Sequence, residues 1–164
     1  LALLARINRE LGLTILLITH EMAVIRAVAH EVAVLAEGRV VERGPVADVF
    51  GAPRHPLTRA LLMGEPGFAL PHAIAARLRP APVPAGETVI RVVFRGEHAT
   101  QAVLARLARD EAIEANILAG TVDEIGGEPF GVLAVAVGSG AETDQALAFF
   151  ARHGLFAEVL GHVP

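Results

Sequence analysis

The sequence predicts two small domains in one chain: an open α/β domain, of which only a part is present, followed by an α+β domain. Three observations lead to this prediction. Five of the ten prolines lie between Gly64 and Glu87, which indicates a linker near the middle of the 164 residues. Before this stretch, a continuous apolar run at residues 14–18 is typical of a buried parallel strand. After it, strand and helix patterns follow one another in the order βαββαβ.

Residues 1–63 form the first predicted domain, and it begins with a helix. Leucine and isoleucine recur at spacings of three and four from Leu1 to Leu11, and Gly12 is suited to end the helix. A second helix is predicted from Met22 to Ala29.

The strands of this domain are predicted from apolar runs and turns. Residues 14–18 are rich in β-branched side chains, as in a strand buried on both faces. Val32–Ala36 and Arg39–Glu42 are predicted to be strands around a turn at residues 37–38. Pro45 then opens a short helix, because proline fits the first helical turn. We expect these elements to be the rear of an open α/β domain, and the chain to be a fragment of a longer protein.

Residues 64–86 are predicted to be a linker with one short helix at Ala73–Leu78, and residues 87–164 form the second domain. Its expected elements are strand Thr88–Arg95, helix Ala99–Arg109 with Thr100 on its apolar side, strands Ala115–Asp123 and Phe130–Val137, helix Glu142–His153 and strand Leu155–Leu160. In the first strand, apolar residues alternate with Arg91 and Arg95, which predicts a half-buried strand. The βαββαβ order is the split ferredoxin-like arrangement. We expect its two helices to cover one face of the sheet and to leave the other free to pair.

Composition excludes several classes of function. With no Cys, a disulfide scaffold, a thiolate nucleophile and a thiolate zinc site are excluded. All 14 basic residues are Arg, which excludes a Schiff-base or phosphate-loop lysine within these residues. The net charge of −4 argues against binding to nucleic acid. The longest nearly uncharged run, residues 131–141, is about half the roughly 20 residues of a membrane-spanning helix.

One of the seven histidines stands apart by its position. The histidines show no spacing typical of a metal site, so we predict no metal and ordinary surface or helix-end roles for six of them. His20 directly follows the predicted buried strand, at the end where open α/β sheets bind ligands. An imidazole there can donate a hydrogen bond to a phosphate oxygen, but on these residues alone a structural role is favoured.

The surroundings of His20 add to this interpretation. Residues 13–22, Leu-Thr-Ile-Leu-Leu-Ile-Thr-His-Glu-Met, resemble the switch-histidine region of ABC-transporter ATPases. Residues 32–44, Val-Ala-Val-Leu-Ala-Glu-Gly-Arg-Val-Val-Glu-Arg-Gly, resemble the strand–turn–strand that follows it in that family. The resemblance covers residues 1–63. It implies that His20 contacts the γ-phosphate of ATP bound between two ATPase domains.

The first half also departs from the family pattern. Ala23 stands where importers of this kind often have Asp, and residues 29–31, Ala-His-Glu, replace a more usual Cys-Asp-basic run. The resemblance further implies a Gly-rich loop with Lys, an Asp-Glu pair and a signature loop, none of which lies within the 164 residues. We therefore expect ATP and Mg to be bound by the intact subunit, and this chain alone to be inactive.

Two further segments indicate the kind of transporter. Residues 52–62, Ala-Pro-Arg-His-Pro-Leu-Thr-Arg-Ala-Leu-Leu, resemble the tail shared by oligopeptide and methionine importer ATPases. Asn116, Ile117 and Leu118 begin the second strand of the second half, and with the Gly-Gly and Phe-Gly pairs that follow they resemble the NIL domain. This second resemblance covers residues 88–163. It implies a regulatory domain similar to ACT amino-acid sensors, found at the carboxyl end of methionine-import ATPases.

The three residues Asn116, Ile117 and Leu118 are candidate ligand-binding residues, with a structural alternative. Asn116 can cap the preceding turn, while Ile117 and Leu118 simply alternate between core and surface. However, the second strand of a βαββαβ sheet lies at an edge with unpaired backbone groups. These groups and the Asn116 amide can hold the carboxylate and ammonium of an amino acid. An edge is also where two copies can join across a two-fold axis.

The resemblances together predict the carboxyl-terminal segment of the ATP-binding subunit of a D/L-methionine ABC importer, with the NIL domain binding methionine for feedback inhibition. Expected partners are a second copy, through both domains, and the membrane permease, at the cytoplasmic face of the bacterial plasma membrane. No nucleic-acid partner is expected. The alternative is a stand-alone amino-acid-sensing or dimerisation module with vestigial ATPase sequence and no catalysis.

Overall fold

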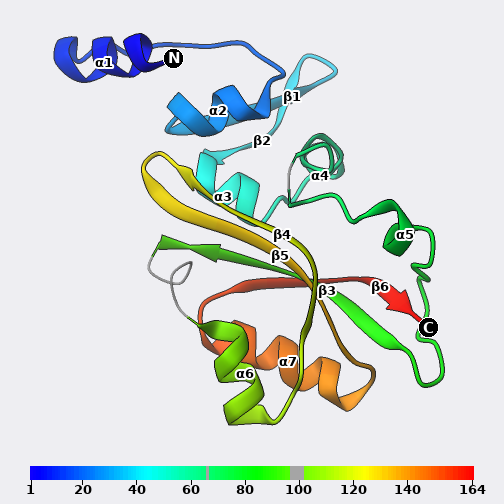
Figure 1. Ribbon diagram of the computed structural model, residues 1–164. Helices are drawn as coiled ribbons and strands as arrows, with labels where there is room; N and C mark the ends of the chain where they lie inside the picture. Colours follow the sequence, from blue (N-terminus) through cyan, green and yellow to red (C-terminus); the bar gives the residue numbers. More distant parts are fainter. Residues whose placement is uncertain (66, 97–101) are drawn as a thin grey trace. The chain divides into compact units, whose positions relative to one another are not determined.

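The computed structural model divides the chain into two compact units, which Figure 1 shows coloured along the sequence. The described residues are 1–65, 67–96 and 102–164. The first unit comprises Leu1–Glu65 and Glu124–Glu128, and the second comprises Pro66–Asp123 and Pro129–Pro164. The stretch expected to be a linker is thus grouped almost entirely with the second unit.

The first unit begins with two helices at the predicted positions. Helix α1 spans Ala2–Leu11 and ends at Gly12, whose φ of 61° is the left-handed conformation that glycine adopts without steric cost. Helix α2 spans Met22–Val28 and buries Ile25. Both helix predictions are confirmed.

The predicted buried strand at residues 14–18 is wrong. No strand is assigned there, and the side chains of Leu16 and Ile18 are 90% and 92% exposed. The sheet of this unit consists of β1 (Glu31–Ala36) and β2 (Arg39–Pro45), paired antiparallel, as predicted for those two strands. A strand forms only where a neighbour accepts its backbone hydrogen bonds, and no described strand lies beside residues 14–18. A parallel sheet is therefore not present among the described residues.

Two short helices complete the first unit. Helix α3 (Val46–Gly51) begins directly after β2, one residue later than predicted. Helix α4 (Pro56–Leu62) was not expected from the apolar pattern. The buried apolar residues of this unit include Ile25, Val34, Val46, Val49, Phe50 and Leu62.

The second unit has the predicted βαββαβ order after a short helix α5 (His72–Ala75). Its elements are β3 (Glu87–Arg95), α6 (Val103–Glu111), β4 (Asn116–Ile125), β5 (Glu128–Gly138), α7 (Ala141–Arg152) and β6 (Phe156–Val163). Residues 99–101 of the predicted first helix, including Thr100, lie outside the described residues. No helix in the described part of the chain is long and apolar enough to cross a membrane.

The four strands lie side by side in the order β4-β5-β3-β6, and β3 pairs antiparallel with both β5 and β6. Strand β4 is therefore at an edge, as expected for the second strand. Helices α6 and α7 lie on the same face of the sheet (Figure 1). The core beneath them contains Ile90, Val92, Phe94, Leu107, Val135, Phe149 and Phe150.

The expectation of a half-buried β3 with one free sheet face is wrong. Every residue from Thr88 to Phe94 is buried, and Arg91 is only 6% exposed. Side chains alternate along a strand, so Arg91 points away from the helix-covered face that holds Ile90 and Val92. Phe68, from the stretch before β3, covers Arg91 there. A central strand becomes buried on both sides when the preceding chain folds back over it.

Candidate functional site

His20 lies in a short exposed turn directly before α2. The Thr19 hydroxyl accepts a hydrogen bond of 3.0 Å from the backbone N–H of Glu21, the residue that precedes the helix. This local bond fixes the turn and leaves the imidazole open to solvent. His20 does not follow a strand, so the sheet-end position expected for it is absent here. Among the residues described, no group of three or more His, Asp or Glu is placed to hold a metal ion.

Glu42 on β2 organises the start of α4 in the segment that resembles the importer tail. Its carboxylate accepts hydrogen bonds from the backbone N–H of Arg54 (2.9 Å) and of His55 (3.0 Å), and from the Thr58 hydroxyl (2.5 Å). Partial burial tends to raise the pKa of Glu42, but these three donors and the charge of Arg54 outweigh it and lower the pKa below its ordinary value. Glu42 therefore fixes the residues that lead into α4, whereas the N-cap is His55, whose Nδ1 accepts a hydrogen bond from the backbone N–H of Leu57.

The sequence reasoning missed Glu42 because its partners lie 12 to 16 residues further along the chain. No local spacing of the capping-box kind connects them. A carboxylate on a strand followed by a proline at the start of a helix is the only available signal, and it is weak.

Asn116, Ile117 and Leu118 open the edge strand β4. Asn116 is exposed, Ile117 is 57% exposed and Leu118 is half-buried. Within the described residues the Asn116 side chain makes no hydrogen bond, so the turn-capping alternative is not observed. The amide is thus available at an edge whose outer backbone groups face no other described strand.

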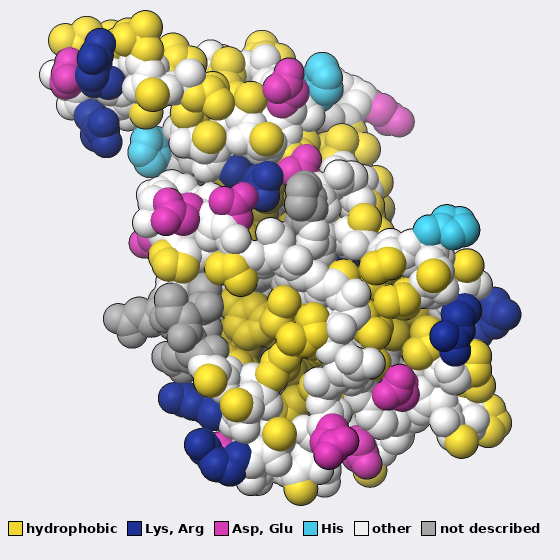
Figure 2. Space-filling model, viewed as in Figure 1, with side chains coloured by type: hydrophobic (Ala, Val, Ile, Leu, Met, Phe, Trp, Pro, Cys, Tyr) yellow, Lys and Arg dark blue, Asp and Glu magenta, His cyan; other side chains and the backbone are white. Residues whose placement is uncertain are grey.

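A groove of about 230 Å³ lies at the other end of β4. Its lining residues are Phe94, Ala102, Val103, Leu104, Ala105, Val122, Gly131 and Leu133. Figure 2 shows hydrophobic side chains gathered over this sheet-and-helix part of the second unit. Gly131 lies on the floor of the groove, where an added Cβ would make ordinary contacts of 3.5 Å with Val122 and 3.6 Å with Phe94.

The structure does not bring Asn116 and this groove together. Asn116 and Val122 are six residues apart on the same strand, which is about 20 Å at roughly 3.3 Å per residue. A free amino acid cannot span that distance. The groove and the Asn116 edge are therefore two separate features, and the groove was not identified from the sequence, since its lining comes from four different segments.

A buried polar cluster lies where β3 begins and β6 ends. The Thr88 hydroxyl is 3.1 Å from His162 Nδ1 and 2.8 Å from the Thr143 hydroxyl. Ser139 donates to the Gly86 carbonyl oxygen at 2.8 Å. Thr88 is fully buried, so the cluster satisfies internal polar groups and joins the strand ends to the start of α7.

Known proteins similar to this chain share both of its halves. The NIL domain family matches residues 88–159, from β3 into β6. The methionine import ATP-binding protein MetN of Cereibacter sphaeroides is 54% identical over 99% of this chain and 46% of its own length. Its counterpart in Rhizobium meliloti is 51% identical, again over 99% of this chain and 46% of the relative. The chain thus contains a NIL domain and is similar over its whole length to methionine import ATP-binding proteins.

The chain spans about half the length of the methionine import ATP-binding proteins it matches and corresponds to their carboxyl-terminal part. The resemblances noted in the sequence are thereby confirmed at the level of the family and of the NIL domain. A solved carboxyl-terminal domain of an ABC transporter ATP-binding protein from Enterococcus faecalis is a more distant likeness, with 22% identity and a TM-score of 0.40. It covers 48% of this chain and 87% of that domain. Asn116, Ile117 and Leu118 fall within the NIL match, whereas His20 lies before it.

Proposed function

We propose that the chain is part of the ATP-binding subunit of a methionine importer, and that its NIL domain binds methionine to inhibit further uptake. The observation that carries the proposal is the 54% identity to a methionine import ATP-binding protein across 99% of the chain, NIL domain included. An unpartnered amide on an open strand edge within that domain supports the ligand-binding part.

The NIL domain is assigned to the ferredoxin-like, ACT-like class. Its βαββαβ chain order, its strand order β4-β5-β3-β6 and its two helices on one face support this assignment. In such a sheet β4 offers free backbone N–H and C=O groups. These groups can pair with the carboxylate and ammonium of methionine while the Asn116 amide adds a further hydrogen bond. Ile117 and Leu118 supply apolar contact for a thioether.

The same edge suits pairing with a second copy across a two-fold axis. On the opposite edge, the residue His162 of β6 already pairs with Arg79 through two backbone hydrogen bonds of 2.8 Å. This bridge covers the end of the β6 edge and so supports β4 as the edge used by both the ligand and the second copy. A ligand at such a junction responds to how the two copies are arranged, and coupling of this kind is worth about 1–3 kcal/mol.

In the intact subunit, ATP with Mg would be the bound nucleotide, and His20 would donate a hydrogen bond to its γ-phosphate. The exposed imidazole directly before α2 supports this role. The 164 residues contain no Lys and no Gly-rich phosphate loop, so the chain alone is proposed not to hydrolyse ATP. The permease partner and the cytoplasmic membrane face belong to the same proposal.

Titration of L-methionine into this chain by calorimetry tests the proposal. We expect saturable binding, and Asn116→Ala should weaken it by about 1–3 kcal/mol, or roughly 5- to 150-fold, by removing a neutral or charge-assisted hydrogen bond. Gln145→Ala, another exposed amide of the same domain but on α7, is the matched control and should bind as the unaltered chain does.

The melting temperatures without ligand separate a lost contact from a damaged fold. Both variants should melt within a few degrees of the unaltered chain, because both side chains are exposed. Equal affinity in the unaltered chain and Asn116→Ala would remove Asn116 from the site. Absence of methionine binding by the unaltered chain would refute the sensing function itself.

A further inference from the structure

The outer edge of β4 has none of the features that usually prevent a sheet edge from pairing. The strand is 10 residues long, and no described strand lies beside its outer edge. Proteins protect such edges with charged side chains, proline or a short strand, because unpaired backbone N–H and C=O groups bind any strand that fits. Residues 116–122 contain no charged residue and no proline. This edge is therefore suited to be paired.

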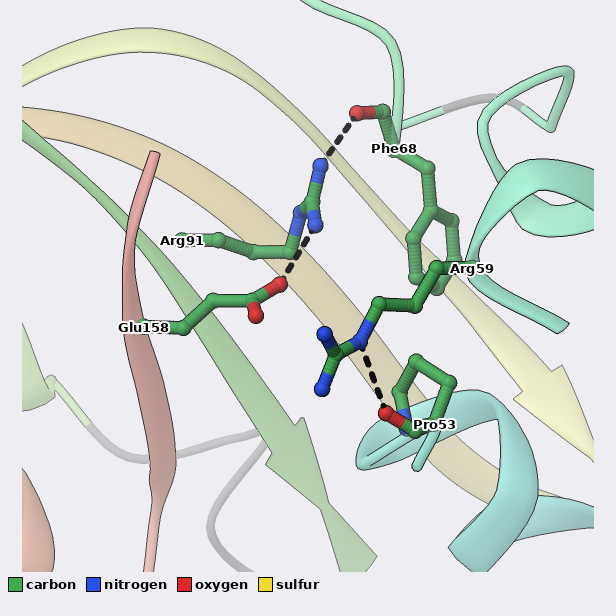
Figure 3. A network of polar contacts seen from close by, with 5 residues as sticks. All are labelled: Pro53, Arg59, Phe68, Arg91 and Glu158. Atoms are coloured by element: carbon green, nitrogen blue, oxygen red, sulfur yellow. Dashed lines mark hydrogen bonds and ion pairs between the residues drawn. The ribbon is translucent and has the colours of Figure 1, made fainter. Parts of the chain in front are cut away.

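The opposite edge strand, β6, carries two protective features. Its Glu158 carboxylate points toward β3 and accepts a hydrogen bond of 2.6 Å from Arg91 Nη1 (Figure 3). Near the end of the strand, Arg79 exchanges two backbone hydrogen bonds of 2.8 Å with His162. An inward-pointing charge and a covered end both hinder the addition of a strand. A strand therefore adds to this sheet more readily along β4.

Gly120 lies in the uncharged segment of β4, and its missing side chain has a steric reason. Its backbone belongs to the strand and has no positive φ, so glycine is not required for the conformation. A Cβ at position 120 would overlap the Leu133 Cδ2 methyl group, which comes from the neighbouring strand β5. Glycine within a strand commonly marks such a close approach. Leu133 therefore reaches out over β4.

Two apolar side chains lie on either side of Gly120 along the same face of β4. Side chains alternate along a strand, so Leu118 and Val122 share the face over which Leu133 lies. Val122 is 69% exposed and Leu118 is half-buried. Val122 also borders the groove beside α6, which places these residues on the helix-covered face. The open edge thus presents apolar surface on this face.

We propose that β4 pairs antiparallel with β4 of a second copy in one register, with Gly120 on the two-fold axis. This inference rests on the pairing with a second copy in the proposed function. In this register Gly120 faces the partner's Gly120, and Leu118 faces the partner's Val122. Facing positions on paired strands have Cβ atoms about 4.5–5.5 Å apart, so the Leu133 methyl groups that lie over these positions approach each other.

The acidic residues near the two ends of β4 disfavour the neighbouring registers. An axis at Ala119 would place Glu114 opposite the partner's Glu124, and like charges directly opposite each other destabilise paired strands. An axis at Thr121 would place the apolar Leu118 opposite the partner's Glu124. The proposed register avoids both arrangements.

Single-cysteine variants measure the register directly, because the chain has no Cys of its own. In the proposed register Ala119 faces the partner's Thr121, and facing residues have Cα atoms about 4.5–5.5 Å apart, which suits a disulfide. After oxidation, a mixture of Ala119→Cys and Thr121→Cys chains should form a disulfide between the two variants, and each variant alone should form little. Efficient cross-linking of either variant alone would place the axis at that residue and overturn the proposed register. Absence of cross-linking in all three samples would overturn pairing along this edge.

A charge placed on the edge provides a second measurement. Val122→Lys should raise the dissociation constant of the dimer at least about tenfold, because it sets a charge against the partner's Leu118. Val159→Lys is the matched control, since Val159 is a 43% exposed valine on the other edge strand, and it should leave the constant unchanged. Sedimentation of the chain measures both constants. An equal response of the two variants, as expected for association through the exposed residues 14–18, would overturn the inference.

Titration with L-methionine separates this inference from the proposed sensing function. A chain that forms the expected disulfide but binds no methionine would refute sensing and support the pairing. A monomeric chain that binds methionine would overturn the pairing and leave the sensing function in place.

Discussion

Two apolar runs of similar composition differ in structure: residues 14–18 form no strand, whereas residues 132–137 lie within one. In the first run Leu16 and Ile18 are 90% and 92% exposed, whereas in the second Val132 and Val135 are fully buried. The second run lies within β5, which has β4 on one side and β3 on the other. The first has no described strand beside it. Apolar and β-branched residues make a segment suited to be a strand. The strand forms only when neighbouring strands pair with it.

The largest expected change in the free energy of unfolding is at a core residue of the second unit. Phe150 is fully buried beneath the sheet, in edge-to-face contact with Phe149 at 5.8 Å between ring centres. Phe150→Ala should lower the free energy of unfolding by about 3–5 kcal/mol, through lost burial and the cavity that remains. Denaturant unfolding followed by circular dichroism measures this, because the chain has neither Trp nor Tyr. A loss below about 1 kcal/mol would mean that the second unit is not closely packed.

An intermediate effect on stability is expected at Glu42, whose carboxylate accepts three hydrogen bonds within the first unit. Glu42→Gln keeps the size of the side chain but removes the charge from three hydrogen bonds. We expect protection of the Arg54 and His55 amides against hydrogen exchange to fall by about 1–2 kcal/mol. The amides of β3 in the second unit are the internal control and should not change.

The same variant predicts a pH dependence. The pKa of Glu42 is lowered in the folded chain, so its stabilising effect is complete above the pKa that the carboxyl has when unfolded. That effect is lost as the pH falls through the lowered, folded pKa. Protection of the Arg54 and His55 amides should therefore decline in acid in the unaltered chain and stay flat in Glu42→Gln. Parallel pH profiles would show that Glu42 is not the group responsible.

The smallest effect on stability is expected in the exposed run. Leu16→Ser should change the free energy of unfolding by less than about 0.5 kcal/mol, because the side chain makes little contact to lose. It should nevertheless reduce self-association, since contiguous exposed apolar residues promote it. Light scattering of the two chains at equal concentration checks this. A loss of stability above about 1 kcal/mol would mean that residues 14–18 are packed in solution.

The sequence predicted the second unit well because its signals are local. Strand and helix periodicities gave the βαββαβ order, and the edge position of β4 followed from that order. What it missed depends on contacts distant in the chain. Arg91 looked like the polar side of a half-buried strand, yet it is buried by Phe68, 23 residues earlier. Residues 14–18 were mistaken for a strand for the converse reason, since periodicity carries no information about whether a partner is present.

At the candidate site the same distinction holds. Asn116 could be proposed because three consecutive residues carry the motif, and Glu42 was missed because its partners are scattered. The α4 helix shows this most clearly. At its start, His55 Nδ1 accepts a hydrogen bond from the backbone N–H of Leu57 at 3.2 Å, and the Glu42 carboxylate of β2 accepts one from the backbone N–H of His55. Neither interaction produces an apolar periodicity in the sequence.

The bridge between Arg79 and His162 also makes the two edges of this sheet unequal. A sheet with two open edges can add copies at both ends without limit, and the product is a fibre. Here the chain's own Leu78–Arg79 segment lies against the end of β6 and pairs with it at His162, so a strand that adds along β6 must first displace this segment. No described strand pairs with the outer edge of β4. Residues that look like a spacer in the sequence therefore disfavour open-ended growth by edge pairing.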